Sequence, residues 1–130
     1  MAHYVDTSAL VKLVVAEADT SALVTWIRAE GSALVSSDLA RTELLRAVRR
    51  VAADRAVQAR AVLDSVTLLT VSTSTFEAAG RLDPTILRTL DALHLAAALE
   101  LGDDLTGIVT YDERMADAAR AHGIAVVSPN

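Results

Sequence analysis

The chain has 130 residues, of which 52% are hydrophobic and 22% are charged, and its formal net charge is −5. This length and apolar content are typical of a single folded domain and exclude intrinsic disorder. The absence of cysteine excludes a disulfide-bonded scaffold, a zinc ribbon and a thiol nucleophile. No apolar run approaches the roughly 18 residues that cross a bilayer. We therefore expect one cytoplasmic domain over residues 1–130 with no membrane partner.

Short apolar segments alternate with segments whose apolar residues recur at helical spacing. In chain order the pattern predicts a strand at 3–5, helices at 7–16 and 20–30, a strand at 33–36, helices at 38–53 and 55–66, a strand at 68–71, helices at 73–82 and 89–101, a strand at 105–110, a helix at 112–122 and a strand at 124–127. This order is typical of parallel strands joined by helical crossovers. The sequence therefore predicts an α/β fold, a three-layer α/β/α sandwich with a parallel central sheet.

Four acidic residues are expected at one edge of this sheet. Asp6 and Asp112 each follow an expected strand, whereas Glu43 and Asp91 lie in the early part of expected helices. In an open parallel sheet, ligands bind outside the carboxyl ends of the strands, near the point where the strand order reverses. We therefore expect the four carboxylates to converge there from four separate segments.

Each acid also has an ordinary structural explanation. An Asp at a helix start caps free backbone amides and suits the helix dipole, which applies to Asp6, Asp91 and Asp112. Glu43 precedes Arg46 by three residues, so the two can belong to an exposed, ion-paired helix face. Asp6 and Asp91, however, stand in apolar surroundings, where a charge is costly unless something compensates it.

A hard divalent cation is the best compensation for these charges. Mg²⁺ and Mn²⁺ prefer oxygen ligands and usually keep several waters. Zinc is disfavoured because the chain has no Cys and no pair of His residues at ligand spacing. A bound Mg²⁺ or Mn²⁺ would activate a water molecule and stabilise the charge that develops on a phosphodiester.

Four segments around these acids resemble the motifs of PIN-domain nucleases, specifically the VapC toxins of bacterial type II toxin–antitoxin pairs. The segments are YVDTSAL at 4–10, SDLARTEL at 37–44, LDALHLAAA at 90–98 and VTYDERM at 109–115. Their order, their spacing and the total length all match, and the resemblance covers essentially the whole chain.

The resemblance implies a PIN fold and a Mg²⁺- or Mn²⁺-dependent endoribonuclease that cleaves RNA with a metal-activated water. It assigns the catalytic and metal-binding roles to four acids: Asp6, Glu43, Asp91 and Asp112. Asp6 and Asp91 are the expected direct ligands, while Ser8 and Thr110 are expected to shape the pocket. The resemblance also implies a cognate VapB-type antitoxin that lies across the active-site groove, and a homodimer.

Half of the positive charges lie between residues 41 and 60. Those that can track RNA phosphates beside the site are Arg41, Arg46, Arg49 and Arg50. A solvated helix face is an equally good explanation of this cluster. With only 3% aromatic residues, we expect the RNA backbone and shape to matter more than base stacking. His94 and Tyr111 are expected to be structural, and Asp117 is expected to be exposed on the last helix.

Other α/β enzymes with strand-end acids lack support in this chain. A haloacid-dehalogenase-like phosphatase needs Asp-x-Asp after the first strand, where this chain has Asp6-Thr7-Ser8. A response-regulator receiver needs a late strand-end Lys, but the only Lys is Lys12, and none of the five Gly forms a phosphate-binding loop. An RNA-processing nuclease of the PIN fold and a non-catalytic RNA- or protein-binding module both stay open.

Overall fold

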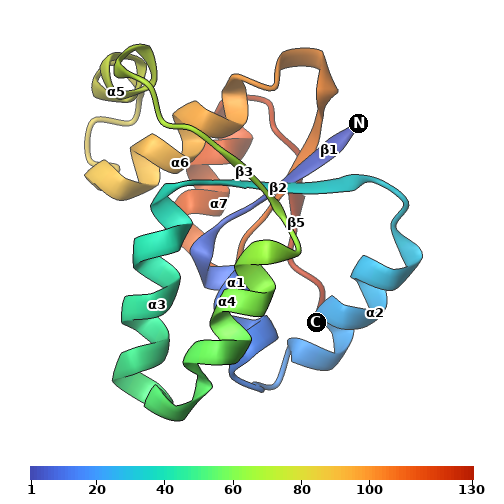
Figure 1. The fold of residues 1–130 in the computed structure, drawn as a ribbon. Coiled ribbons are helices and arrows are strands. Elements are labelled where there is room, and N and C mark those ends of the chain that lie inside the picture. Colours follow the sequence, from blue (N-terminus) through green and yellow to red (C-terminus); the bar gives the residue numbers. More distant parts are fainter.

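The computed structural model describes residues 1–130 and contains one sheet of five parallel strands (Figure 1). The strand order is β3-β2-β1-β4-β5. The strands are β1 (Ala2–Val5), β2 (Ala33–Ser37), β3 (Thr67–Leu69), β4 (Leu105–Val109) and β5 (Val126–Val127). The predicted α/β class and the parallel central sheet are therefore confirmed.

Helices connect every pair of consecutive strands. They are α1 (Thr7–Val14), α2 (Thr20–Ala29), α3 (Leu39–Val51), α4 (Ala56–Asp64), α5 (Thr73–Gly80), α6 (Thr89–Leu99) and α7 (Glu113–Ala121), with short 3-10 turns at Ala53–Arg55 and Gly102–Asp104. All the predicted helices and strands are present, and their ends differ from the expected ends by a residue or two. These differences arise because helix and strand ends depend on capping and pairing that periodicity does not encode.

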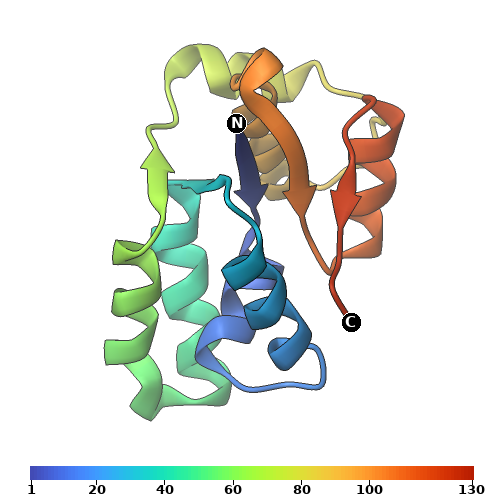
Figure 2. The same cartoon turned by 90° about the vertical axis from the view of Figure 1, so that its right-hand side faces the viewer.

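The sheet separates two apolar cores, because successive side chains of a strand point to opposite faces. On one face, Tyr4 of β1 packs in a cluster with Leu95 of α6 and Met115 of α7. On the other face, Val5 packs in a cluster with residues of α1, α3 and α4, including Leu44. Figures 1 and 2 show helices on both sides of the sheet, which makes the predicted three-layer sandwich.

The strand order reverses between β1 and β4 at the centre of the sheet. The chain first builds outward from β1 to β2 and β3, and then returns to add β4 and β5 on the other side of β1. Beyond the last residue of β1, the Asp6 backbone N–H donates a hydrogen bond of 3.2 Å to the Val109 carbonyl at the end of β4. The residues that follow the two central strands thus lie together at the carboxyl-end edge of the sheet, where α/β folds commonly bind ligands.

None of the helices is both long enough and apolar enough to span a membrane.

Candidate active site

Asp6 is buried, with 4% of its surface exposed. Its carboxylate accepts hydrogen bonds from the Ser8 hydroxyl at 2.6 Å, from the Thr110 hydroxyl, and from the Ala9 backbone N–H at 3.2 Å. The Ala9 bond caps α1, so the capping explanation holds for Asp6, but the two hydroxyl bonds go beyond capping. Burial raises the pKa of Asp6, and the hydroxyl donors only partly oppose that effect. A charged Asp6 is therefore costly until a cation approaches it.

Thr110 connects Asp6 to Asp112. Its hydroxyl donates to the Asp6 carboxylate and accepts a hydrogen bond of 3.1 Å from the Asp112 backbone N–H. The Ser8 hydroxyl lies 3.3 Å from that of Thr110 and accepts the Tyr111 N–H at 2.9 Å. Ser8 and Thr110, the two residues expected to shape the pocket, thus both contact Asp6 and tie the start of α1 to the end of β4.

Glu43 lies on α3 and contacts residues from two other helices. One carboxylate oxygen accepts a hydrogen bond of 2.9 Å from the Thr7 hydroxyl and a second bond from His94 Nε2. Burial alone would raise the pKa of Glu43, but the hydrogen bond and charge of His94, together with Thr7, outweigh burial and lower it. Glu43 contacts His94 and makes no ion pair with Arg46, so the explanation of Glu43 as part of an exposed ion-paired face is wrong.

His94 does more than fill the core, which the sequence pattern did not reveal. The residue is 2% exposed, and its Nδ1 lies 2.7 Å from the hydroxyl of Tyr4, which is fully buried. The two ring nitrogens of His94 thus contact Glu43 on one side and Tyr4 on the other. Burial raises the pKa of Tyr4, so its phenol stays protonated. The available signal was a polar residue inside the apolar run of α6, in which Ala92 to Ala98 are all buried.

Arg88 joins Asp91 and Asp112 at the rim of the site. Its Nε donates to Asp91 at 3.0 Å, and a terminal nitrogen donates to Asp112 at 2.9 Å. Asp112 also caps α7 by accepting the Arg114 N–H at 2.9 Å, as the capping explanation predicts. Asp91 accepts no backbone N–H at the start of α6, so capping does not explain it. Arg88 is a site residue that sequence reasoning missed, since nothing in its local pattern shows that Asp91 and Asp112 flank it.

Hydrogen bonds therefore connect three of the four acids in one network, and Glu43 adjoins it only through the neighbouring position of Thr7 in the chain. Thr110 links Asp6 to Asp112, Arg88 links Asp112 to Asp91, and Glu43 is held by the residue that follows Asp6. No three acidic or His side chains already surround a single point as a metal cluster. The donor set still fits Mg²⁺ or Mn²⁺ chemically, because these ions often bind one or two carboxylates and complete their shell with water.

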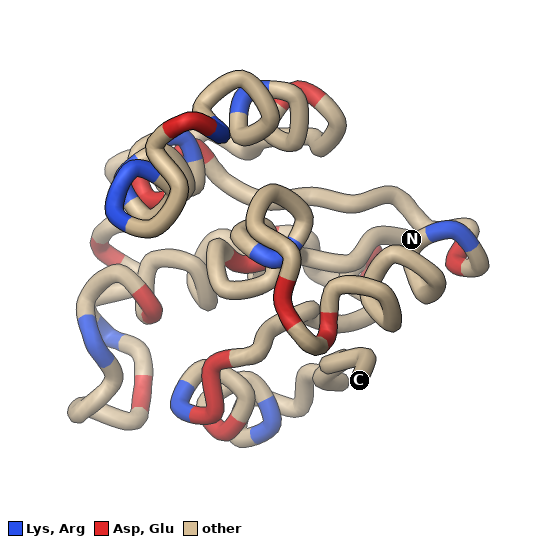
Figure 3. The backbone as a smooth tube through the Cα atoms, turned by 90° about the horizontal axis from the view of Figure 1, so that it is seen from below, with Lys and Arg blue, Asp and Glu red and all other residues tan.

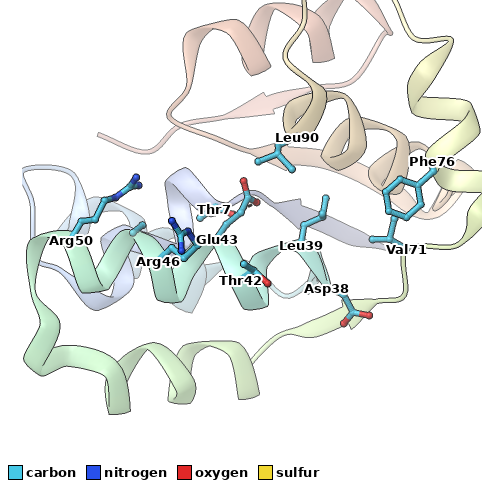
Figure 4. Close-up of a pocket in the computed structure, with 11 residues that line it drawn as sticks. Thr7, Asp38, Leu39, Thr42, Glu43, Arg46, Arg50, Val71, Phe76 and Leu90 are labelled. Carbon is cyan, nitrogen blue, oxygen red and sulfur yellow. Dashed lines mark hydrogen bonds between the residues drawn. The ribbon is translucent and has the colours of Figure 1, made fainter.

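Glu43 also faces a pocket of about 610 Å³ (Figure 4). Arg46 and Arg50 line this pocket, while Arg41 on the same helix is paired with Asp38 at 2.9 Å. A smaller depression of about 250 Å³ is lined by Arg46, Arg49 and Arg50 alone. Of the four arginines expected to bind RNA, three thus lie together, and the fourth, Arg41, is paired with Asp38. Elsewhere, basic and acidic residues are interspersed along the backbone (Figure 3).

Two further expectations are met outside this network. Asp117 is exposed on α7 and pairs with Arg120 at 3.4 Å. The Tyr111 hydroxyl donates to the Pro129 carbonyl at 2.7 Å, and the Lys12 ammonium lies 4.6 Å from the Tyr111 ring centre. Tyr111 is therefore held by structural contacts.

Comparison with known proteins identifies the family of this chain. A family model described as the PIN domain matches residues 3–121. The chain is 44% identical to Ribonuclease VapC46 of Mycobacterium tuberculosis over 129 residues, covering 99% of this chain and 98% of that protein. It is 39% identical to Ribonuclease VapC47 of the same species over 130 residues, covering 97% and 96%.

Two solved structures have the same fold. Mycobacterium tuberculosis VapC20, described as a sarcin-ricin loop cleaving toxin, superposes with a TM-score of 0.80 at 20% identity, over 99% of this chain and 100% of that chain. A toxin–antitoxin complex from Klebsiella pneumoniae superposes with a TM-score of 0.72 at 18% identity, over 98% of each chain. The sequence match over nearly the full length carries the assignment, and the chain belongs to the PIN-domain family, among the VapC ribonucleases.

Proposed function

We propose that this protein is a Mg²⁺- or Mn²⁺-dependent endoribonuclease that acts as the toxin of a type II toxin–antitoxin pair. Its relatives at 44% and 39% identity are named ribonucleases and match nearly the whole chain. The observation that carries the proposal is the buried Asp6 carboxylate, held by two hydroxyls at the point where the strand order reverses. A buried carboxylate with a raised pKa in such a place is typical of a functional site.

Asp6 and Asp91 would hold the metal, and Glu43 and Asp112 would complete the site directly or through water. When bound, the ion supplies an activated water and neutralises charge on the scissile phosphate. The remaining contacts position these carboxylates. Ser8 and Thr110 orient Asp6, and the buried His94 fixes the carboxylate of Glu43. Such supporting contacts matter because a metal site loses activity when its ligands are free to rotate.

The proposed partners follow from the same family membership. One fold neighbour is described as a toxin–antitoxin complex. We propose that a VapB-type antitoxin covers the groove beside Glu43 in the cytoplasm, and that the protein pairs as a homodimer. Co-expression with the neighbouring small gene, followed by co-purification and measurement of molar mass, tests both partners at once.

The experiment that tests the function is cleavage of total cellular RNA by the antitoxin-free protein, with Mg²⁺, with Mn²⁺ and with EDTA. We expect cleavage only with metal, and loss of cleavage in Asp91→Asn. The matched control is Asp117→Asn, which removes an acid that is exposed and paired only with Arg120. Cleavage that survives EDTA or Asp91→Asn would reject the proposed site, as would equal losses in both variants.

The non-catalytic alternative is tested by metal-dependent stability. An ion that binds only the native state raises the melting temperature. We expect Mn²⁺ to raise the melting temperature of the wild type more than that of Asp91→Asn. A folded protein that Mn²⁺ does not stabilise, and that cuts no RNA with any metal, would favour a binding module.

A further inference from the structure

Lys12 is the only lysine of the chain, and its side chain is only 12% exposed in the last turn of α1. Its ammonium pairs with Glu17 at 3.1 Å and with Asp19 at 3.6 Å. The same nitrogen lies 4.6 Å from the centre of the Tyr111 ring. Three partners from two other segments therefore hold this cation, whereas most lysines extend into water.

Tyr111 lies in the short connection between the end of β4 and the start of α7. Its backbone N–H donates to the Ser8 hydroxyl at 2.9 Å. The N–H of the next residue, Asp112, donates to the Thr110 hydroxyl at 3.1 Å. Both hydroxyls also contact the Asp6 carboxylate. The position of this connection therefore decides where the carboxylate of Asp112 lies relative to that of Asp6.

The side chain of Tyr111 holds the same connection from the opposite end. Its hydroxyl donates to the Pro129 carbonyl at 2.7 Å, and Lys12 covers one face of its ring. The negative face of an aromatic ring attracts a cation, and the attraction strengthens when the cation is withdrawn from water, as Lys12 is. Lys12, Tyr111 and Asp112 also line one cavity of about 310 Å³.

The ammonium is not needed to hold the segment between α1 and α2. The Thr20 hydroxyl donates to the Lys12 backbone carbonyl at 2.8 Å and accepts the Glu17 N–H at 2.9 Å. These bonds fasten the segment through backbone atoms, which any residue at position 12 would supply. The charge of Lys12 therefore has its distinctive partner in the ring of Tyr111, over which the two acids hold it.

We propose that Lys12 is a positioning residue for the metal site, because its ammonium holds the Tyr111 ring and the ring fixes the connection that presents Asp112. The inference rests on the proposed metal-dependent function and deepens it, since it adds a residue that touches neither the ion nor the RNA. A lysine suits this place better than an arginine. Its compact ammonium points donors at two carboxylates and still approaches the ring, whereas a guanidinium is a larger planar group.

The first test is the affinity for Mn²⁺, measured by calorimetry without RNA. We expect Lys12→Met to weaken binding roughly tenfold, which is typical of losing a contact that orients a metal ligand. Tyr111→Leu, which removes the aromatic face, should have a similar effect, and the double variant should lose no more than Tyr111→Leu alone. Tyr111→Phe keeps the face and should bind Mn²⁺ nearly as the wild type does. Glu17→Gln is the matched control, because it leaves both Asp19 and the ring beside the ammonium.

Equal Mn²⁺ affinities of Tyr111→Leu and Tyr111→Phe would overturn the positioning role. So would equal losses in Lys12→Met and Glu17→Gln, since Lys12 would then serve the segment between α1 and α2. Circular dichroism checks that each variant folds. If Tyr111→Leu does not fold, the comparison of Lys12→Met with Glu17→Gln decides the matter.

The second test is cleavage of RNA with Mn²⁺ under single-turnover conditions, which separates this inference from the proposed function. We expect Lys12→Met to lower the rate at saturating RNA and to leave the RNA concentration for half-maximal rate unchanged. A wild type that cuts RNA, with Lys12→Met unchanged in rate and in Mn²⁺ affinity, would overturn the role of Lys12 alone. A wild type that shows the expected pattern of Mn²⁺ affinities but cuts no RNA would reject only the ribonuclease. A wild type that binds no Mn²⁺ and cuts no RNA would reject both.

Discussion

His94 of α6 holds Glu43 of α3 through a hydrogen bond from Nε2 to the carboxylate, although 51 positions separate them in the sequence. The opposite ring nitrogen lies 2.7 Å from the buried Tyr4 hydroxyl of β1. The order Tyr4, His94, Glu43 therefore runs from the core of the protein to its proposed active site. A ring fixed from both sides leaves the Glu43 carboxylate little freedom to rotate.

His94→Leu is expected to lower the rate of RNA cleavage roughly 10- to 100-fold, the usual cost of removing a group that orients a metal-site ligand. Leu has a similar volume, so the variant is expected to fold, which circular dichroism checks. His94→Gln is the matched control, because its amide still donates to Glu43, and it is expected to retain most of the activity. Equal losses in the two variants under single-turnover conditions would show that the Glu43 contact is not the reason for the loss.

Asp6→Asn is expected to lower the rate of RNA cleavage more than about 100-fold. The same substitution is expected to raise the melting temperature at neutral pH. Burial raises the pKa of Asp6 above its ordinary value of 3.8. The folded state then holds this proton to a higher pH than the unfolded state, so stability falls as the pH rises from 3.8 through the folded pKa. The Asn side chain carries no charge and avoids that loss.

Thermal melting in EDTA at about pH 7 and about pH 4 tests the sign of this effect. The stabilisation by Asp6→Asn should be largest at the higher pH and should shrink at the lower one. A variant that is destabilised equally at both values would mean that the lost hydrogen bonds, and not the buried charge, control the result.

The fold was predictable because its signals are local. Apolar strands such as β4 and amphipathic helices such as α3 carry their periodicity within a few residues, and their alternation implies a parallel sheet. The position of Asp6 was predictable for a related reason, since a carboxylate that directly follows an apolar strand stands at the sheet edge. The end of a strand can therefore be predicted from the sequence wherever a charged residue directly follows an apolar run.

The partners of the acids were not predictable, because they join distant segments. Arg88 reaches Asp112 from 24 positions away, and Tyr4 reaches His94 from 90 positions away. Which side chains meet depends on how the crossover helices pack on the sheet, and no single-sequence pattern records that packing.

Thr110→Val is expected to lower both stability and activity. Val keeps the shape of the side chain but removes the hydroxyl that donates to Asp6 and accepts from the Asp112 N–H. Unsatisfied buried polar groups cost about 1–3 kcal/mol each, and this sets the expected loss in the free energy of unfolding. Thr110→Ser retains the hydroxyl and should lose much less. Urea unfolding of the three proteins measures the difference, and equal midpoints for the Val and Ser variants would contradict the bridging role.

Arg88→Ala is expected to tighten Mn²⁺ binding. The guanidinium lies between Asp91 and Asp112, so it occupies two carboxylates that a metal would use. This exposed guanidinium is charged at every relevant pH, and its hydrogen bond with Asp91 and the charges of both acids raise the pKa of Arg88 further. Removing it frees both acids. Because exposed ion pairs are weak individually, the expected gain in affinity is modest, roughly two- to tenfold.

Calorimetric titration with Mn²⁺ in the absence of RNA measures this gain without depending on catalysis. Arg120→Ala is the matched control, since Arg120 also pairs with an Asp three positions away on a helix and is equally exposed, at 58% of the side chain. That variant should bind Mn²⁺ like the wild type. If Arg88→Ala binds Mn²⁺ no more tightly than Arg120→Ala does, then Arg88 does not compete with the metal for Asp91 and Asp112. If it binds more weakly, Arg88 holds the two acids in place for the ion, and its positive charge is an aid to the metal site and not a competitor.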